Sequence, residues 1–190
     1  MKIGLIDVDG HRFPNLCLMK LSAYHKARGD MVEWYDNGKC YDLVYMSRVF
    51  TDTYSKDYEG NIKACHVIKG GTGYGLDNKL PDAVEHTHPD YGLYPQFAGT
   101  AYGFLSRGCP RGCGFCIVGD KEGRKTVAVA DLSEFWGGLA GTLENCIYLC
   151  DEGVPDDPKR HTGTLVGIYA NNGGCGTRIP ADFDYFEYLD

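Results

Sequence analysis

The sequence predicts an α/β fold built on a parallel sheet, and the spacing of its apolar residues is the basis. Residues 2–8 (KIGLIDV) are almost continuously apolar, which predicts a buried strand, and residues 15–28 carry apolar side chains at helical spacing. Short strands are expected at 31–35, 41–47 and 64–68, with glycine or aspartate between them. Strands that alternate with helical stretches in this way are typical of a doubly wound parallel sheet.

Ligands bind such a sheet outside the carboxyl ends of its strands. The loops concerned begin near Asp7, Ser47 and Lys69, so we expect these residues to lie near one edge of the sheet. The glycine-rich loop 70–75 (GGTGYG) has two interpretations at this stage. It either forms a wall of a ligand site or is a structural turn.

A connecting segment is expected at 80–99, because it contains three prolines and little periodicity. We therefore expect two domains, 1–95 and 96–190. In the second domain, short strands are expected at 101–105 and 146–149, and the chain from about residue 138 onward has no firm assignment.

Composition excludes several classes of protein. The chain has 19 Lys and Arg against 26 Asp and Glu, and its basic residues are scattered, so we expect no nucleic-acid partner. Asp7 and Asp9 come too early for a signal peptide, and no apolar run reaches membrane-spanning length, so we expect a cytoplasmic protein without a membrane partner. Nine cysteines are an odd number for a disulfide framework, which favours metal or cofactor ligation.

Three of the cysteines stand close together in the loop 106–119. Cys109, Cys113 and Cys116 are separated by gaps of three and two residues, among two glycines and a proline. Iron-sulfur clusters are held by thiolates at close spacings, and a cubane cluster normally has four protein ligands. Three local ligands would leave one iron open to another molecule.

Two other interpretations of this loop remain. A structural zinc site could use Cys146 and Cys150 as a second pair of ligands. Buried, unligated cysteines that behave as small apolar residues suit Cys17, Cys40 and Cys65, each of which stands alone in an apolar context.

The pattern Cys-x-x-x-Cys-x-aromatic-Cys, directly after an apolar strand, resembles the cluster loop of the radical S-adenosylmethionine (SAM) superfamily. The resemblance implies that Cys109, Cys113 and Cys116 bind a 4Fe-4S cluster whose open iron is chelated by S-adenosyl-L-methionine. It also implies that Phe115 lies beside the adenine, whereas the alternative for Phe115 is a core aromatic. The implied function is reductive cleavage of SAM to a 5'-deoxyadenosyl radical, with a flavodoxin or ferredoxin as reductant and an unknown substrate.

A wider resemblance covers roughly residues 1–137. The stretches LIDVDGH, GGTGYG, LPD and PDYGLYP are similar to an uncharacterised bacterial and phage-associated radical SAM group. In that group a Rossmann-like domain, similar to cobalamin-binding domains, precedes the cluster loop. Cobalamin itself is not expected, because its motif Asp-x-His-x-x-Gly appears here as Asp9, His11 and then Pro14 in place of the glycine.

The resemblance implies an incomplete (β/α) barrel after the Rossmann-like sheet, since too few residues follow Cys116 for the remaining strand-helix units. Asp151 and Glu152, after the strand 146–149, would then hold the SAM amino group. A partner subunit or a dimer would complete the barrel. The alternative functions are a non-catalytic iron-sulfur or electron-transfer module, and a truncated inactive fragment.

Overall fold

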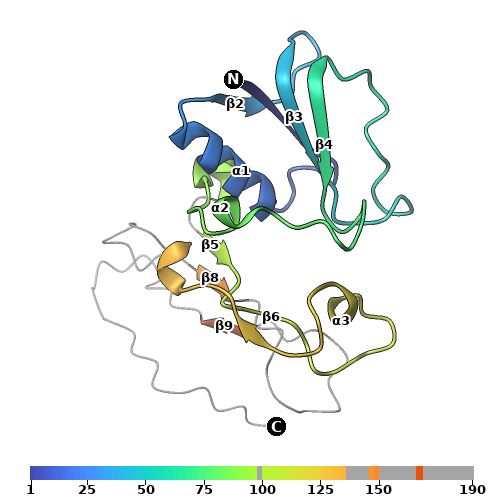
Figure 1. Cartoon of the computed structure of the whole chain (residues 1–190), viewed down its shortest axis with the longest axis vertical. Helices are drawn as coiled ribbons and strands as arrows, with labels where there is room; N and C mark the ends of the chain where they lie inside the picture. The colour runs from blue at the N-terminus through green and yellow to red at the C-terminus, as the bar shows by residue number, and fades with distance from the viewer. Residues whose placement is uncertain (98–99, 136–145, 150–165, 169–190) are drawn as a thin grey trace.

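A computed structural model describes residues 1–97, 100–135, 146–149 and 166–168 (Figure 1). Its strands are β1 Lys2–Asp7, β2 Met31–Trp34, β3 Tyr41–Ser47, β4 Ala64–Gly70, β5 Thr100–Gly103, β6 Ser106–Arg107, β7 Val127–Ala128, β8 Cys146–Leu149 and β9 Val166–Ile168. Its α-helices are α1 Leu16–Ala27, α2 Asp82–Glu85 and α3 Val118–Lys121. Short 3-10 turns are η1 Tyr91–Leu93, η2 Pro95–Phe97 and η3 Leu132–Glu134.

The first sheet has four strands in the order β2-β1-β3-β4, and every neighbouring pair is parallel. Asp7 at the end of β1 lies opposite Ser47 at the end of β3, and Ser47 lies opposite Gly70 at the end of β4. These three strands therefore end at one common edge, which we call the carboxyl edge. Parallel pairing is what the alternation of strand and helix predicts for these segments.

Helix α1 begins and ends where the sequence supplies caps. The Asn15 side chain accepts a hydrogen bond from the backbone N–H of Leu18 at 3.2 Å, which satisfies one of the free N–H groups of the first turn. At the other end, the N–H groups of Arg28 and Asp30 both donate to the carbonyl of His25. Gly29 adopts the positive φ of 83° that a helix C-terminus favours.

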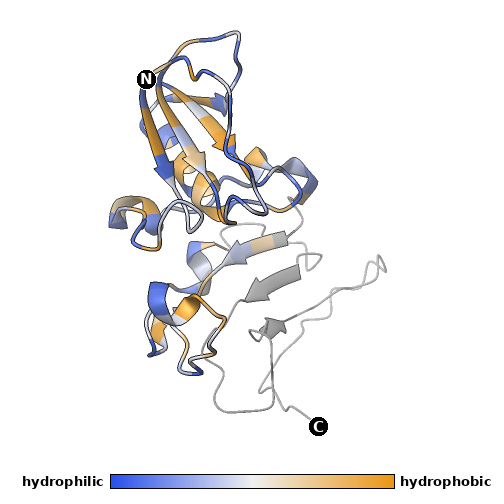
Figure 2. Cartoon of the chain, turned by 90° about the vertical axis from the view of Figure 1, so that its right-hand side faces the viewer, coloured by the Kyte–Doolittle hydropathy of each residue, from blue (hydrophilic) through white to orange (hydrophobic). Residues whose placement is uncertain are grey.

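The two faces of this sheet are covered differently. Helix α1 packs on one face, where the largest core cluster contains Ile3, Leu5, Leu18, Met19, Leu21, Leu43, Val84, Leu93 and Tyr94. On the other face, a second cluster of Ile6, Tyr41, Val44 and Met46 is covered by partly buried side chains that include Tyr35, Tyr58 and Tyr74. Figure 2 shows the apolar residues running along the strands between these two covers.

This arrangement corrects the predicted fold class for the N-terminal part. A doubly wound, Rossmann-like sheet carries helices on both faces. Here α1 and α2 contribute to the core on one face only, and the connections 35–40 and 48–63 contain no helix (Figure 1). Both connections are rich in aspartate, glycine and tyrosine and lack helical apolar spacing, so tyrosine-bearing loops cover the second face.

The expected incomplete (β/α) barrel is also wrong. The second sheet has the order β5-β8-β9, in which β8 pairs with β5 in parallel and with β9 antiparallel. Strands β6 and β7 form a separate antiparallel pair. A (β/α) barrel is parallel throughout, so an antiparallel pairing inside the sheet is incompatible with one.

Residues 100–135 contact the segment that precedes them. The Tyr91 hydroxyl donates to the carbonyl of Phe135 at 2.7 Å, and Arg107 forms an ion pair with Glu85 at 3.2 Å. The division into domains near residue 95 stays a prediction. Among the described residues, no helix combines the length and the apolar character needed to cross a membrane, and the cytoplasmic location stays a prediction.

Candidate functional site

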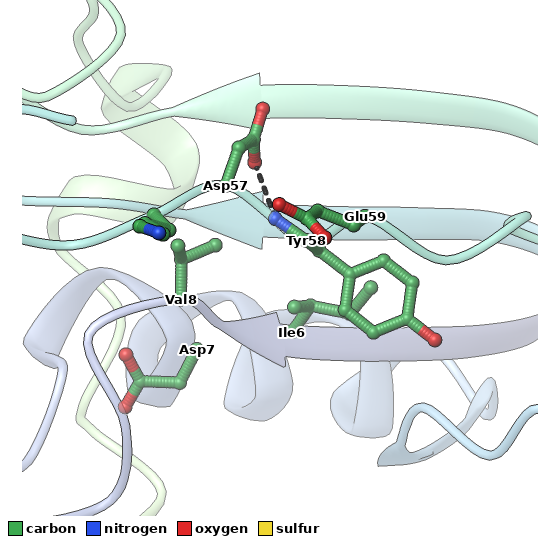
Figure 3. A pocket seen from close by; sticks show the side chains of 7 residues that line it. Ile6, Asp7, Val8, Asp57, Tyr58 and Glu59 are labelled. Atoms are coloured by element: carbon green, nitrogen blue, oxygen red, sulfur yellow. Dashed lines mark hydrogen bonds between the residues drawn. The ribbon is translucent and has the colours of Figure 1, made fainter.

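A cavity with a volume of about 480 Å³ opens at the carboxyl end of β1 (Figure 3). Its lining comes from two segments, Ile6, Asp7 and Val8 on one side and Lys56, Asp57, Tyr58 and Glu59 on the other. The chain leaves β1 toward β2 and leaves β3 toward β4, on opposite sides of the sheet. Ligand sites in open parallel sheets lie at such a point of divergence.

Asp57 fixes the second wall of the cavity to β4. One of its carboxylate oxygens accepts a hydrogen bond from the Lys69 ammonium at 2.7 Å, and the other accepts one from the Tyr74 hydroxyl. These donors, the Lys69 ammonium first, lower the pKa of Asp57 to about 2. Asp57 is therefore ionised at neutral pH, and both of its oxygens already have partners.

Asp7 belongs to a different environment. Its carboxylate accepts a hydrogen bond from the Tyr94 hydroxyl at 2.7 Å. Burial raises the pKa of Asp7, and the Tyr94 hydrogen bond opposes that shift only in part. The Asp7 and Asp57 carboxylates point away from each other (Figure 3), so they do not form a facing pair of the kind used in acid-base hydrolysis.

Lys56 and Glu59 are exposed and differ from the two aspartates, since the structure shows neither an ion pair nor a hydrogen bond for their side chains. The other glutamates in the described part of the chain all form ion pairs: Glu33, Glu85, Glu122 and Glu134. Opposite charges without partners thus stand on one wall of the cavity.

The apolar part of the lining comes from Ile6, Val8 and the ring of Tyr58. Ile6 is buried, Val8 and Tyr58 are partly buried, and all three belong to or pack against the tyrosine-covered core. The Tyr58 hydroxyl donates to Asn37 at 2.7 Å, which fixes the ring. The cavity therefore combines an apolar surface with charged groups.

The loops around the carboxyl edge are tied to one another. The Asp9 carboxylate accepts hydrogen bonds from the backbone N–H groups of Val49 at 2.6 Å and Phe50 at 3.3 Å. The Asn15 amide donates to the Ser47 hydroxyl at 2.8 Å, which joins the cap of α1 to the end of β3. These contacts hold the edge in one arrangement.

The glycine-rich loop 70–75 packs on Arg48, which is 6% exposed. An added Cβ at Gly71 would lie 2.2 Å from the Arg48 carbonyl oxygen, and one at Gly73 would lie 2.2 Å from the Phe50 carbonyl oxygen. The Arg48 guanidinium donates to the Gly73 carbonyl at 2.6 Å and lies over the Tyr74 ring. Close backbone approach therefore explains these two glycines.

His11, the residue considered for cobalamin, lies against aromatic rings. Its ring centroid is 4.2 Å from that of Trp34 in an edge-on arrangement and 5.8 Å from that of Tyr94. Its backbone carbonyl accepts a hydrogen bond from Gln96. His11 is nevertheless exposed, so these rings contact only part of it.

The cysteine loop is a partly exposed turn. The Cys109 N–H donates to the carbonyl of Gly123, and the Cys116 N–H donates to that of Cys113. The three cysteines have free thiols. Within the part of the chain that the structure describes, no group of three or more His, Cys, Asp or Glu side chains is placed to hold a metal ion.

The other predicted cofactor residues have mixed outcomes. Phe115 is 76% exposed, so it is not a core aromatic. Asp151 and Glu152 lie outside the described residues. The assignment of Cys109, Cys113, Cys116 and Phe115 as site residues stays a prediction.

Residues 131–189 match one family model, GH43_C2, described as a beta xylosidase C-terminal concanavalin A-like domain. The match covers the C-terminal third of the chain. No curated protein matches the sequence, and no solved structure matches it either.

This match overturns the predicted identity. The matched family is described as a concanavalin A-like domain, an architecture of β-strands, and the match falls within the part of the chain where a radical SAM core was expected. The radical SAM resemblance was therefore wrong. The same finding contradicts the predicted cofactors, a 4Fe-4S cluster and S-adenosyl-L-methionine, and the radical chemistry. It also contradicts the iron-sulfur and electron-transfer alternatives.

The cavity residues Lys56, Tyr58 and Glu59 were missed by the sequence interpretation. They lie in the connection after β3, and the rule that ligands bind at the carboxyl ends of strands pointed to the loop that begins at Ser47. The available signal was the cluster of charged and aromatic residues at 56–59, in a connection without helical spacing.

Proposed function

We propose that the chain is a ligand-binding protein that holds a small organic molecule in the cavity at the carboxyl end of β1. The observation that supports this proposal is the lining, in which an apolar surface of Ile6, Val8 and Tyr58 adjoins the charged groups of Lys56 and Glu59. The volume of about 480 Å³ falls in the range of roughly 300 to 1,000 Å³ that is usual for small-molecule sites.

The hydrogen bonds around the cavity favour binding because they fix its walls in advance. Asp57 ties the wall 56–59 to Lys69, and Asp9 ties the loop after β1 to the loop after β3. A wall that is already ordered loses little conformational entropy when a ligand arrives.

A second candidate function is carbohydrate binding through residues 131–189. It is supported by the match to a domain described as part of a beta xylosidase. The two candidates concern different segments and different ligands, so one titration series can separate them.

Isothermal titration of the full chain tests the proposal with 2-phenylethanol, phenethylamine, 3-phenylpropionate, L-phenylalanine and xylobiose as probes. We expect at least one phenyl compound to bind with a stoichiometry of one. Val8→Phe fills the cavity and should abolish that binding, whereas Val49→Phe, at an exposed valine outside the cavity lining, should leave it unchanged.

Because Val8→Phe could disturb folding, a second pair of variants checks the result. Tyr58→Ala removes a ring from the cavity wall, and Tyr54→Ala removes a ring that is 81% exposed in the same connection. Binding should weaken in the first variant alone. No binding by any phenyl compound overturns the proposal, and binding of xylobiose alone establishes the second candidate in its place.

A further inference from the structure

We infer that the ligand of the cavity is a zwitterion, a free α-amino acid with an apolar side chain, and this inference rests on the proposed function. The cavity wall presents one ammonium group, on Lys56, and one carboxylate without a partner, on Glu59. A molecule that carries one charge of each sign complements both groups at once.

The two aspartates of the lining already accept hydrogen bonds from the protein. Asp57 accepts hydrogen bonds from Lys69 and Tyr74, and Asp7 accepts one from Tyr94. The two exposed charged side chains of the lining are Lys56 and Glu59, whose charges are opposite.

Glu59 differs from the other glutamates of the described residues because it forms no ion pair there. Every other glutamate in the described ranges has an ion-pair partner within 3.5 Å, as at Glu33, whereas no ion pair joins Lys56 to Glu59. Two opposite charges that stand three residues apart without contacting each other leave both groups available to a ligand.

The apolar surface of the cavity suits the side chain of an apolar amino acid, the group that remains after its ammonium and carboxylate. Ile6, Val8 and Tyr58 line the same cavity as these charged residues. In this arrangement the Lys56 ammonium donates to the ligand carboxylate, the ligand ammonium donates to the Glu59 carboxylate, and the side chain packs on the apolar wall. A dipolar ligand with an apolar side chain makes all three contacts, and compounds that lack one charge make two.

Four matched phenyl compounds test this assignment by titration at low ionic strength, where exposed charges are least screened. L-phenylalanine has both charges, phenethylamine lacks the carboxylate, 3-phenylpropionate lacks the amine, and 2-phenylethanol lacks both. We expect L-phenylalanine to bind roughly tenfold more tightly than either singly charged compound, which is the gain expected from one charge-assisted hydrogen bond.

Two variants of the cavity wall assign each charge to its partner. Lys56→Met should weaken L-phenylalanine and 3-phenylpropionate by roughly tenfold and leave phenethylamine unchanged. Glu59→Gln should weaken L-phenylalanine and phenethylamine and leave 3-phenylpropionate unchanged. Lys63→Met is the control, because Lys63 is exposed just before β4 begins, at the opposite edge of the sheet.

The outcomes separate this inference from the proposed function. If all four compounds bind equally and neither charge variant changes them, while Val8→Phe still abolishes binding, the zwitterion assignment is overturned and the cavity remains a ligand site. If none of the four compounds binds, the proposed function fails and this inference fails with it.

Discussion

The two edges of the parallel sheet differ in how some of their charged groups are paired. At the amino edge, where the strands begin, Asp30 pairs with the Met1 ammonium and with His25 Nδ1, both at 2.7 Å. The His25 Nε2 atom lies 3.0 Å from the Tyr45 hydroxyl, so both ring nitrogens have partners. At the carboxyl edge, Lys56 and Glu59 have no partner among the residues that the structure describes.

The pKa shifts of two aspartates express the same difference. Hydrogen bonds from the Met1 ammonium and from His25 lower the pKa of Asp30, so the fold stabilises its charge. Burial raises the pKa of Asp7, so the fold disfavours the charge at the cavity. The Asp30 charge thus contributes to stability at the amino edge, whereas the Asp7 charge opposes it at the carboxyl edge.

The largest change in the free energy of unfolding should come from replacing a glycine by alanine at the carboxyl edge, with a glycine near the amino edge as its counterpart. Gly71→Ala places a Cβ 2.2 Å from the Arg48 carbonyl in a backbone with φ of 95°, whereas Gly29→Ala has a similar φ of 83° and no atom within 4 Å. We expect Gly29→Ala to lower the free energy of unfolding by about 1 kcal/mol and Gly71→Ala by about 3 kcal/mol or more. Urea unfolding measures both free energies. Equal losses of stability would show that the loop around Arg48 shifts to accommodate the added Cβ without cost.

A smaller loss is expected at the paired edge. His25→Ala removes a buried ring and leaves Asp30 and Tyr45 without that partner, which should cost about 2 to 3 kcal/mol of unfolding free energy. His66→Ala is the matched control, because His66 is exposed on β4 and should change stability by less than about 0.5 kcal/mol. Similar losses in the two variants would show that the pairing at His25 contributes nothing.

The pH dependence of stability should have opposite signs at the two edges. The lowered pKa of Asp30 contributes stability above the ordinary value of 3.8, and this contribution is lost as the pH falls through the folded pKa. The raised pKa of Asp7 means that the folded state holds its proton longer, so stability falls as the pH rises from 3.8 through the folded pKa.

Two substitutions check these signs. Near neutral pH, Asp30→Asn should destabilise the chain and Asp7→Asn should stabilise it, and both differences should shrink as the pH falls into the acid range, where the wild-type carboxyl groups become protonated. Chemical unfolding at several pH values measures them. A destabilised Asp7→Asn variant near neutral pH would show that the Asp7 charge is favoured by the fold.

The positions of the N-terminal elements were predictable from the sequence. The apolar run at 2–8 and the helical spacing at 15–28 correspond to β1 and α1, and Asn15 and Gly29 mark the ends of the helix by known capping preferences. The fold class was not predicted correctly, because strand-helix alternation does not say how many faces carry helices. The loops 35–40 and 48–63 cover the second face with tyrosines instead.

The site was predictable only in part. The rule for parallel sheets placed it at the edge that contains Asp7 and Ser47, but it did not select the residues of the following loop. Lys56 and Glu59 are exposed charges in an irregular connection, and sequence spacing does not reveal whether such charges have partners. The cysteine motif was specific in pattern, yet a short local motif did not indicate which family model the C-terminal third matches.

The most direct test of the central claim is a titration of ¹⁵N-labelled protein with L-phenylalanine, followed by backbone amide shifts. The account predicts saturable shifts at Ile6, Val8 and Tyr58, with Lys63 and Val32 near the amino edge unchanged. Shifts confined to the amino edge or to residues 131–189, or no shifts at all, would contradict it.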